Sequence, residues 1–128
     1  LWIKTRTADQ SEPMTLHARE YWKQRFAADR EQLEQTRQAG LAQATKAAAA
    51  MRERWPQIRA VHLFGSVLDD RFRSHSDLDL LVDGLPPAAL LDAIALAEGA
   101  GPLPVDLKRQ EDLSEDLVQR LLRKSQTL

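Results

Sequence analysis

The 128-residue chain contains no cysteine, and this absence excludes several kinds of chemistry. Disulfide bonds, thiolate catalysis, iron–sulfur clusters and cysteine-bound zinc all need that residue. Aromatic residues are few, at 5%, and no apolar run approaches the ~18–20 residues of a membrane-spanning helix. The first residues lack the basic, apolar and small-residue blocks of a signal peptide. We therefore expect a soluble, cytoplasmic protein with no membrane partner.

Length and charge limit the number of domains and the kinds of ligand to expect. A chain of 128 residues predicts one domain, with room for a helical appendage but not for a second core. The net charge of −1 averages two unlike parts: residues 1–58 hold ten Lys and Arg against seven Asp and Glu, and residues 59–128 hold eight against twelve. An acidic half argues against direct nucleic-acid binding, because phosphate contacts need a basic face. Clustered carboxylates instead suit a site for metal ions.

The first part of the chain is predicted to be helical. Residues 1–14 are polar and aperiodic, so we expect a frayed or disordered terminus. From Thr15 to Trp55 apolar residues recur at helical spacing, and Pro56 ends the run. Because Gly40 costs about 1 kcal/mol in a helix interior, the pattern allows one long helix or two shorter ones. We assign residues 15–40 to an N-terminal helical extension.

This extension carries three neighbouring aromatic side chains, Tyr21, Trp22 and Phe26. Such residues are costly to leave in water. Two interpretations stay open. The extension packs back on its own domain, or it makes a contact with a partner, including a possible homodimer.

Residues 41–128 show a different pattern, in which β-rich runs alternate with helical segments. The β-rich runs cover residues 59–64, 77–82 and 103–107, and helical patterns follow Pro86 and Ser114. This alternation predicts a two-layer α/β domain, with a small sheet packed on helices.

Two short motifs of this domain carry candidate chemistry. Gly65-Ser66 forms a tight turn directly after the first strand, where backbone and hydroxyl groups can approach phosphate oxygens. Ten residues later come Asp77 and Asp79, which share one face of a strand because side chains alternate. Two such carboxylates repel each other unless a cation or proton lies between them, and oxygen ligands favour Mg²⁺ or Mn²⁺.

A third carboxylate, Asp106, interrupts the apolar run of the last predicted strand. An aspartate in a buried strand is costly unless it is paired or bound to a ligand. Beside the strand of Asp77 and Asp79 it would complete a three-carboxylate cluster able to hold two metal ions for phosphoryl transfer. The alternative is a salt bridge to Lys108 or Arg109.

The spacing of Gly65-Ser66 and Asp77-Leu78-Asp79 resembles the signature of the DNA polymerase beta-type nucleotidyltransferases. The small size is similar to the minimal nucleotidyltransferase (MNT) family, often the antitoxin partner of HEPN ribonuclease toxins. The resemblance covers residues 41–128. It implies the polymerase-beta-like α+β fold, a small mixed sheet packed on helices, with the N-terminal helix as an addition.

The resemblance also implies an activity and a set of roles. The expected reaction moves AMP from ATP to a hydroxyl group of a partner protein, a HEPN-type toxin, with Mg²⁺ or Mn²⁺. Gly65 and Ser66 would bind the nucleotide's phosphates. Asp77, Asp79 and Asp106 would ligate the metal, and Asp106 would also assist deprotonation of the attacking hydroxyl.

One segment departs from the family pattern. The family shows a small or basic stretch ending in Arg-Gly after Gly-Ser, whereas this chain has Val67-Leu68-Asp69-Asp70. An expected phosphate contact is lost there, which leaves nucleotide affinity and catalysis open. Candidate replacements for the missing cation are Arg71, Arg73, Lys108 and Arg109. Two alternative functions remain: a non-catalytic antitoxin that acts by binding, and a transferase that acts on a small molecule.

Overall fold

A computed structural model describes residues 15–128, which form two compact units. The first unit ends at Gln32, and the second comprises Leu33–Leu128. The expectation of a frayed terminus at residues 1–14 lies outside the described residues. The division predicted after residue 40 stays a prediction. Within residues 15–128, no helix combines the length and apolar character needed to cross a bilayer.

Helix α2 runs from Leu16 to Arg54, so the helical pattern forms one helix instead of two. The Thr15 hydroxyl accepts a hydrogen bond from the Ala18 N–H at 3.2 Å, as a cap should. Gly40 does not break the helix, because it serves close packing: a Cβ added there would lie 2.5 Å from Cδ1 of Leu103. Tertiary packing therefore offsets the low helix propensity of glycine.

The aromatic side chains of the first unit lie in solvent. Tyr21, Trp22 and Phe26 are 55%, 44% and 57% exposed. The rings of Trp22 and Phe26 stack, with centroids 5.9 Å apart and an interplanar angle of 29°. Aromatic residues of this size normally occur in cores or interfaces, so this exposure marks a candidate contact surface.

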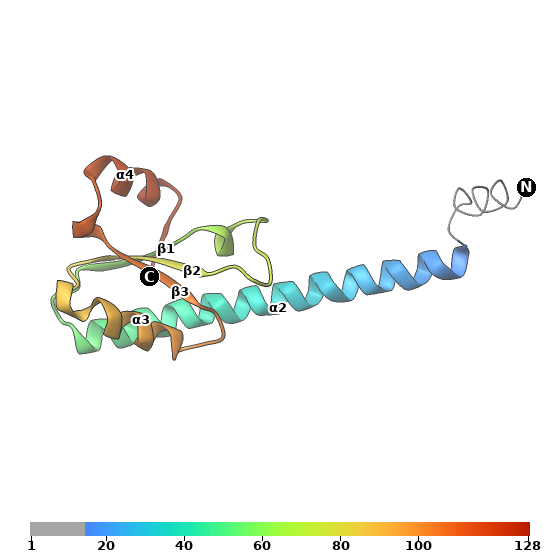
Figure 1. The fold of residues 1–128 in the computed structure, drawn as a ribbon, viewed down its shortest axis with the longest axis horizontal. Helices are drawn as coiled ribbons and strands as arrows, with labels where there is room; N and C mark the ends of the chain where they lie inside the picture. The colour runs from blue at the N-terminus through green and yellow to red at the C-terminus, as the bar shows by residue number, and fades with distance from the viewer. Residues whose placement is uncertain (1–14) are drawn as a thin grey trace, which may run out of the picture. The chain divides into compact units, whose positions relative to one another are not determined.

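The second unit is built on a four-stranded mixed sheet (Figure 1). Its strands, in the spatial order β3-β2-β1-β4, are β1 (Ala60–Phe64), β2 (Leu78–Asp83), β3 (Val105–Arg109) and β4 (Gln126–Thr127). Strand β1 is antiparallel to β2 and β4, whereas β2 is parallel to β3. The three predicted strands and the α+β class are confirmed, and β4 is an addition that the sequence did not reveal.

Helices cover both faces of this sheet. Helix α3 (Leu90–Glu98) makes the crossover between β2 and β3, and it lies with α2 on one face (Figure 1). Helix α4 (Glu115–Arg123) lies over the other face and begins at Ser114, whose side chain accepts the Leu117 N–H. Alternation along β2 buries Leu78, Leu80 and Val82 in the core beneath α2 and α3. The intervening positions of the strands therefore face the side of α4, where the predicted site residues lie.

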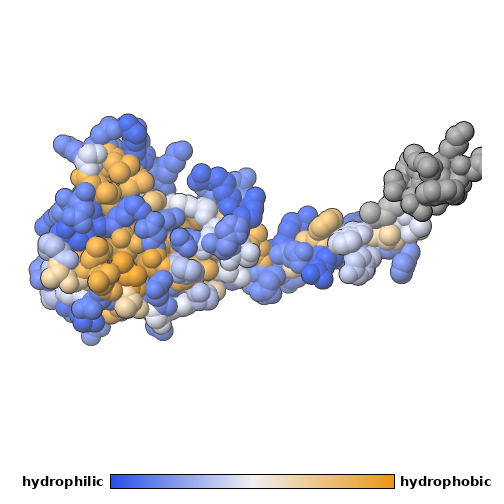
Figure 2. Space-filling model, viewed as in Figure 1, coloured by the Kyte–Doolittle hydropathy of each residue, from blue (hydrophilic) through white to orange (hydrophobic). Residues whose placement is uncertain are grey.

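Hydrophilic side chains cover much of the second unit, but apolar ones interrupt them over α3 and α4 (Figure 2). Leu91 of α3 is 79% exposed, and Leu117 of α4 is 38% exposed. Isolated exposed leucines are ordinary on protein surfaces. They carry no functional conclusion here.

One buried polar side chain ties α2 to the loop that leads into β3. Gln43 is 1% exposed, and its amide nitrogen donates to the carbonyl oxygens of Ala97 (3.0 Å) and Leu103 (2.9 Å). Its amide oxygen accepts the Leu103 N–H at 2.8 Å. All the backbone groups that Gln43 contacts are thereby satisfied without water.

We expect Gln43→Ala to lower the free energy of unfolding by about 2–4 kcal/mol, because buried backbone groups lose their partners. Equilibrium denaturation in urea measures this loss. The control is Gln35→Ala on the exposed surface of the same helix, expected to change stability by no more than about 0.5 kcal/mol. Equal stability of the two variants would show that the Gln43 bonds do not anchor the loop.

Candidate active site

Two of the predicted metal-ligating aspartates lie side by side on the sheet. The parallel pairing of β2 with β3 places Asp79 directly opposite Asp106. Asp77 lies just before β2 and is exposed. The Asp106 side chain is 46% exposed, and its carboxylate accepts a hydrogen bond from Lys108 Nζ at 2.8 Å. Of the two alternatives for Asp106, the salt bridge to Lys108 is present, and Asp106 also lies opposite Asp79. A cluster of three carboxylates around a metal stays a prediction.

Gly65 brings the chain backbone against Asp79. The antiparallel register pairs Phe64 with Asp79, so the turn at Gly65 begins beside that carboxylate. Gly65 has a φ of +86°, and a Cβ added to it would lie 2.0 Å from Oδ2 of Asp79. Only glycine fits this combination of backbone conformation and space. The Gly-Ser turn and the Asp-x-Asp motif are therefore one local structure.

The turn after Gly65 is held by a residue that the sequence did not suggest. Ser66–Leu68 form a short 3₁₀ turn, with the Leu68 N–H bonded to the Gly65 carbonyl at 3.1 Å. Arg37 of α2 donates a hydrogen bond to the Val67 carbonyl at 2.8 Å and so ties the turn to the helix. A lone arginine on a long charged helix gives no sequence signal of this role. Within residues 15–128, no hydrogen bond engages the Ser66 hydroxyl, which leaves it available to a ligand.

The electrostatics of the site centre on Asp79. The half-buried carboxyl has no hydrogen-bond or ion-pair partner in the described part of the chain, and burial raises its pKa to about 6. The negative charge of Asp106, and to a smaller extent that of Asp77, contributes to this rise in pKa, whereas Lys108 opposes it. The negative charges of Asp77, Asp79 and Asp106 therefore exceed the positive charge that Lys108 supplies beside them. A bound cation would relieve this excess.

This shift predicts how stability depends on pH. The pKa of Asp79 is about 6 in the folded protein, against 3.8 when unperturbed. The folded state thus holds the proton more tightly, and the stability that Asp79 contributes at low pH is lost as pH rises through about 6. We expect Asp79→Asn to stabilise the metal-free protein by about 1–2 kcal/mol at pH 7.5, after allowance for solvent screening of a half-exposed group. At pH 4 the two proteins should differ little.

Denaturant unfolding of both proteins in a metal chelator, at pH 4 and pH 7.5, measures this difference. Asp69 and Asp83, whose pKa values are lowered by their arginine partners, also make stability depend on pH. They do so equally in both proteins, so the difference between the two proteins reports on Asp79. A stability difference that is the same at both pH values would contradict the prediction.

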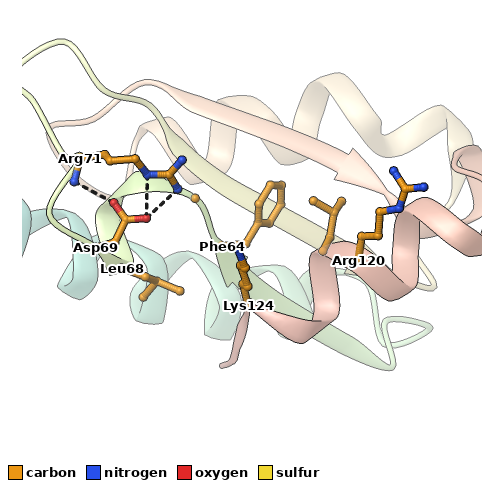
Figure 3. A pocket seen from close by; sticks show the side chains of 8 residues that line it. Phe64, Leu68, Asp69, Arg71, Arg120 and Lys124 are labelled. Atoms are coloured by element: carbon orange, nitrogen blue, oxygen red, sulfur yellow. Dashed lines mark hydrogen bonds and ion pairs between the residues drawn. The ribbon is translucent and has the colours of Figure 1, made fainter.

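The basic residues proposed as replacements for the missing phosphate contact already have partners within the protein. Arg71 makes three hydrogen bonds to the Asp69 carboxylate, two from its guanidinium and one from its backbone N–H (Figure 3). Arg73 donates to nearby backbone carbonyls, and Lys108 pairs with Asp106. Arg109 is 8% exposed and binds the Leu85 carbonyl and Asp112. Arg109 is therefore a structural cation of the core.

The donor set fits a hard divalent cation, because it consists of carboxylate oxygens with excess negative charge. Among residues 15–128, no group of three or more His, Asp or Glu side chains converges closely enough to form a metal site by itself. Paired Asp79 and Asp106 would supply the main ligands, with Asp77 at the entry to β2. The assignment of these three residues as ligands remains a prediction.

Comparisons with known proteins agree with this geometry. The sequence profile of a family described as a nucleotidyltransferase domain matches residues 44–127. A protein assigned as a minimal nucleotidyltransferase is 31% identical, with a TM-score of 0.50, over 78% of this chain and 96% of that chain. No curated protein sequence matches the chain significantly.

Two structures of toxin–antitoxin complexes share the fold. One, a toxin–antitoxin with AMP-PNP, has a TM-score of 0.58 and 23% identity over 66% of this chain and 70% of the other. The second contains a tri-AMPylated HEPN toxin of Shewanella oneidensis with its MNT antitoxin. Its TM-score is 0.54 at 21% identity, over 69% of this chain and 70% of the other.

Proposed function

The chain belongs to the nucleotidyltransferase domain family, and on this basis we propose that it transfers AMP from ATP to a hydroxyl group of a partner protein. We propose a HEPN-type toxin as the partner, because MNT antitoxins in toxin complexes share this fold. The observation that carries the proposal is the contact of Gly65 with Asp79, beside Asp106, which joins the phosphate-binding turn to the carboxylates. The reaction would take place in the cytoplasm, where ATP is available.

The residues of the site divide the work of this reaction. The Gly65 backbone and the Ser66 hydroxyl would hold the phosphate chain, since their turn leaves room for a ligand. Asp77, Asp79 and Asp106 would hold Mg²⁺ or Mn²⁺, which supplies positive charge against the charge that develops on the phosphates. The protein contributes position and electrostatics, and needs no covalent intermediate.

The proposed transfer is balanced in bonds and protons. The acceptor oxygen forms a bond to the α-phosphorus of ATP while the bond from that phosphorus to the bridging oxygen breaks, and pyrophosphate leaves. The acceptor proton passes to Asp106, whose half-exposed carboxylate can accept it and release it to water. Lys108, at 2.8 Å from Asp106, keeps that carboxylate oriented between proton transfers.

The test is an AMP-transfer assay with the full chain, a HEPN-type protein, α-labelled ATP and Mg²⁺. Label on the partner, and a mass increase of the partner equal to AMP, would support the proposal. Absence of label under conditions where the chain binds ATP would contradict it.

A non-catalytic antitoxin is the second candidate, favoured by the exposed aromatic surface of the first unit. Trp22 and Phe26, with Arg19, Lys23 and Arg30, line a hollow of about 370 Å³ on α2. This surface could join the chain to a partner protein or to a second copy of itself. Neutralisation of the partner that survives loss of the site aspartates would favour this function over transfer.

A further inference from the structure

A cavity of about 320 Å³ opens between the end of β1, the 3₁₀ turn and helix α4 (Figure 3). Apolar side chains of Phe64, Leu68 and Leu121 line part of it, and the backbone of Gly65 reaches its wall. The cavity therefore begins where the predicted phosphate-binding turn lies. A ligand held at Gly65 would extend into it.

Four charged side chains also line this cavity: Asp69, Arg71, Arg120 and Lys124. The charges of Asp69 and Arg71 offset each other, because Arg71 is bonded to that carboxylate at 2.6 Å and 3.0 Å. Arg120 forms an exposed i,i+4 ion pair with Asp116 at 2.7 Å. An exposed pair of this kind is weak and easily exchanged for another anion.

Lys124 differs from these residues. Within residues 15–128, no carboxylate lies within ion-pair distance (4.0 Å) of its ammonium group, although its charge helps to lower the pKa of the Asp69 carboxyl. Of the four charged side chains that line the cavity, Lys124 is therefore the one without an ion pair. A lysine with three N–H donors beside a cavity suits an anion with several oxygens.

The phosphate chain of a nucleoside triphosphate is the anion that fits this arrangement. The turn after Ser66 carries Asp69 and Asp70, so it supplies no cation for the phosphates. Arg71, the nearest basic residue along the chain, is held by Asp69. Arg120 of helix α4 and Lys124, which directly follows that helix, therefore supply the positive charge that the turn lacks, from a segment more than fifty residues away in sequence.

We propose that Lys124, assisted by Arg120, binds the phosphate chain of the donor nucleotide in the cavity between Gly65 and α4. The inference rests on the proposed function, because it takes the donor to be a nucleoside triphosphate. It assigns nucleotide-binding residues to the last turn of α4 and to the residue that follows it, a segment that the sequence motifs do not include.

The test measures the affinity of the full chain for the non-hydrolysable analogue AMP-PNP with Mg²⁺, by isothermal titration calorimetry. We expect Lys124→Gln to weaken binding about tenfold, because a charge-assisted contact to phosphate is lost, and Lys124→Arg to retain most of the affinity. Binding should also depend less steeply on salt in Lys124→Gln than in the unsubstituted protein. In the transfer assay, Lys124→Gln should raise the KM for ATP with little change in kcat.

The matched control is Arg123→Gln, which removes the same charge from the last residue of α4 but does not line the cavity. Its affinity should stay within about twofold of the unsubstituted protein, and thermal unfolding should show that both variants are folded. Equal affinities of Lys124→Gln and Arg123→Gln would overturn the inference even if AMP transfer is observed. Tight AMP-PNP binding that depends on Lys124, without AMP transfer to any partner, would instead overturn the proposed function and support the cavity assignment. A chain that does not bind AMP-PNP at all would overturn both.

Discussion

Asp79→Asn is expected to reduce AMP transfer by at least about 100-fold, although it should leave the protein folded and more stable. The substitution removes the carboxylate that lies against Gly65 and opposite Asp106, so cation binding and phosphate positioning are lost together. The same carboxylate is destabilising without a cation, since its pKa is raised to about 6. Function and stability should therefore change in opposite directions.

The measurement combines initial rates of AMP transfer with denaturant unfolding of the same preparations. Asp92→Asn is the control, because Asp92 lies in α3 on the opposite face of the sheet, where it forms a long ion pair of 3.7 Å with Arg54. Its rate should equal that of the unsubstituted protein. Retention of full transfer by Asp79→Asn would exclude this site as the catalytic centre, and retention of partner neutralisation without transfer would favour the binding function.

Gly65→Ala is expected to have the largest combined effect, a loss of about 2–4 kcal/mol in stability together with loss of transfer. The φ of +86° is strained for any residue with a side chain, and the added methyl group would lie 2.0 Å from Oδ2 and 2.9 Å from Cγ of Asp79. The turn must move or the carboxylate must rotate away. Either change separates the Gly65-Ser66 turn, which we propose binds phosphate, from the carboxylates.

Gly99→Ala provides a matched control for this substitution. Gly99 has a φ of −70°, and a Cβ there would meet its nearest neighbour at 3.4 Å. Its stability should change by less than about 1 kcal/mol, with transfer unaffected. We also expect Gly65→Ala to cost less in the Asp79→Ala background, because the carboxylate that it strikes is absent. Simple additivity of the two substitutions would contradict the contact.

The short segments with strong local signals were predictable from the sequence. Alternation over 77–82 identified β2, and Thr15 and Ser114 were correct helix caps. Strand β4 could not be predicted, because Gln126–Thr127 are only two residues and form a strand solely through pairing with β1. The choice between one helix and two also depended on tertiary contacts, since the propensity cost of Gly40 is offset by its packing against Leu103.

In the candidate site, too, some features were predictable from the sequence and others depended on tertiary contacts. The sequence by itself identified the two motifs and predicted their chemistry, because side chains alternate along a strand and glycine indicates a special turn. The roles of these residues in a reaction stay a prediction. Only the tertiary structure decided that Asp79 lies opposite Asp106, that Gly65 touches Asp79, and that Lys124 lines the cavity that Gly65 also lines. Those contacts join strands and a helix far apart in sequence, and local periodicity carries no information about which distant segments pair. The absence of cysteine excluded thiolate ligands and thiolate catalysis, and the fold then placed Asp79 against Gly65 and opposite Asp106.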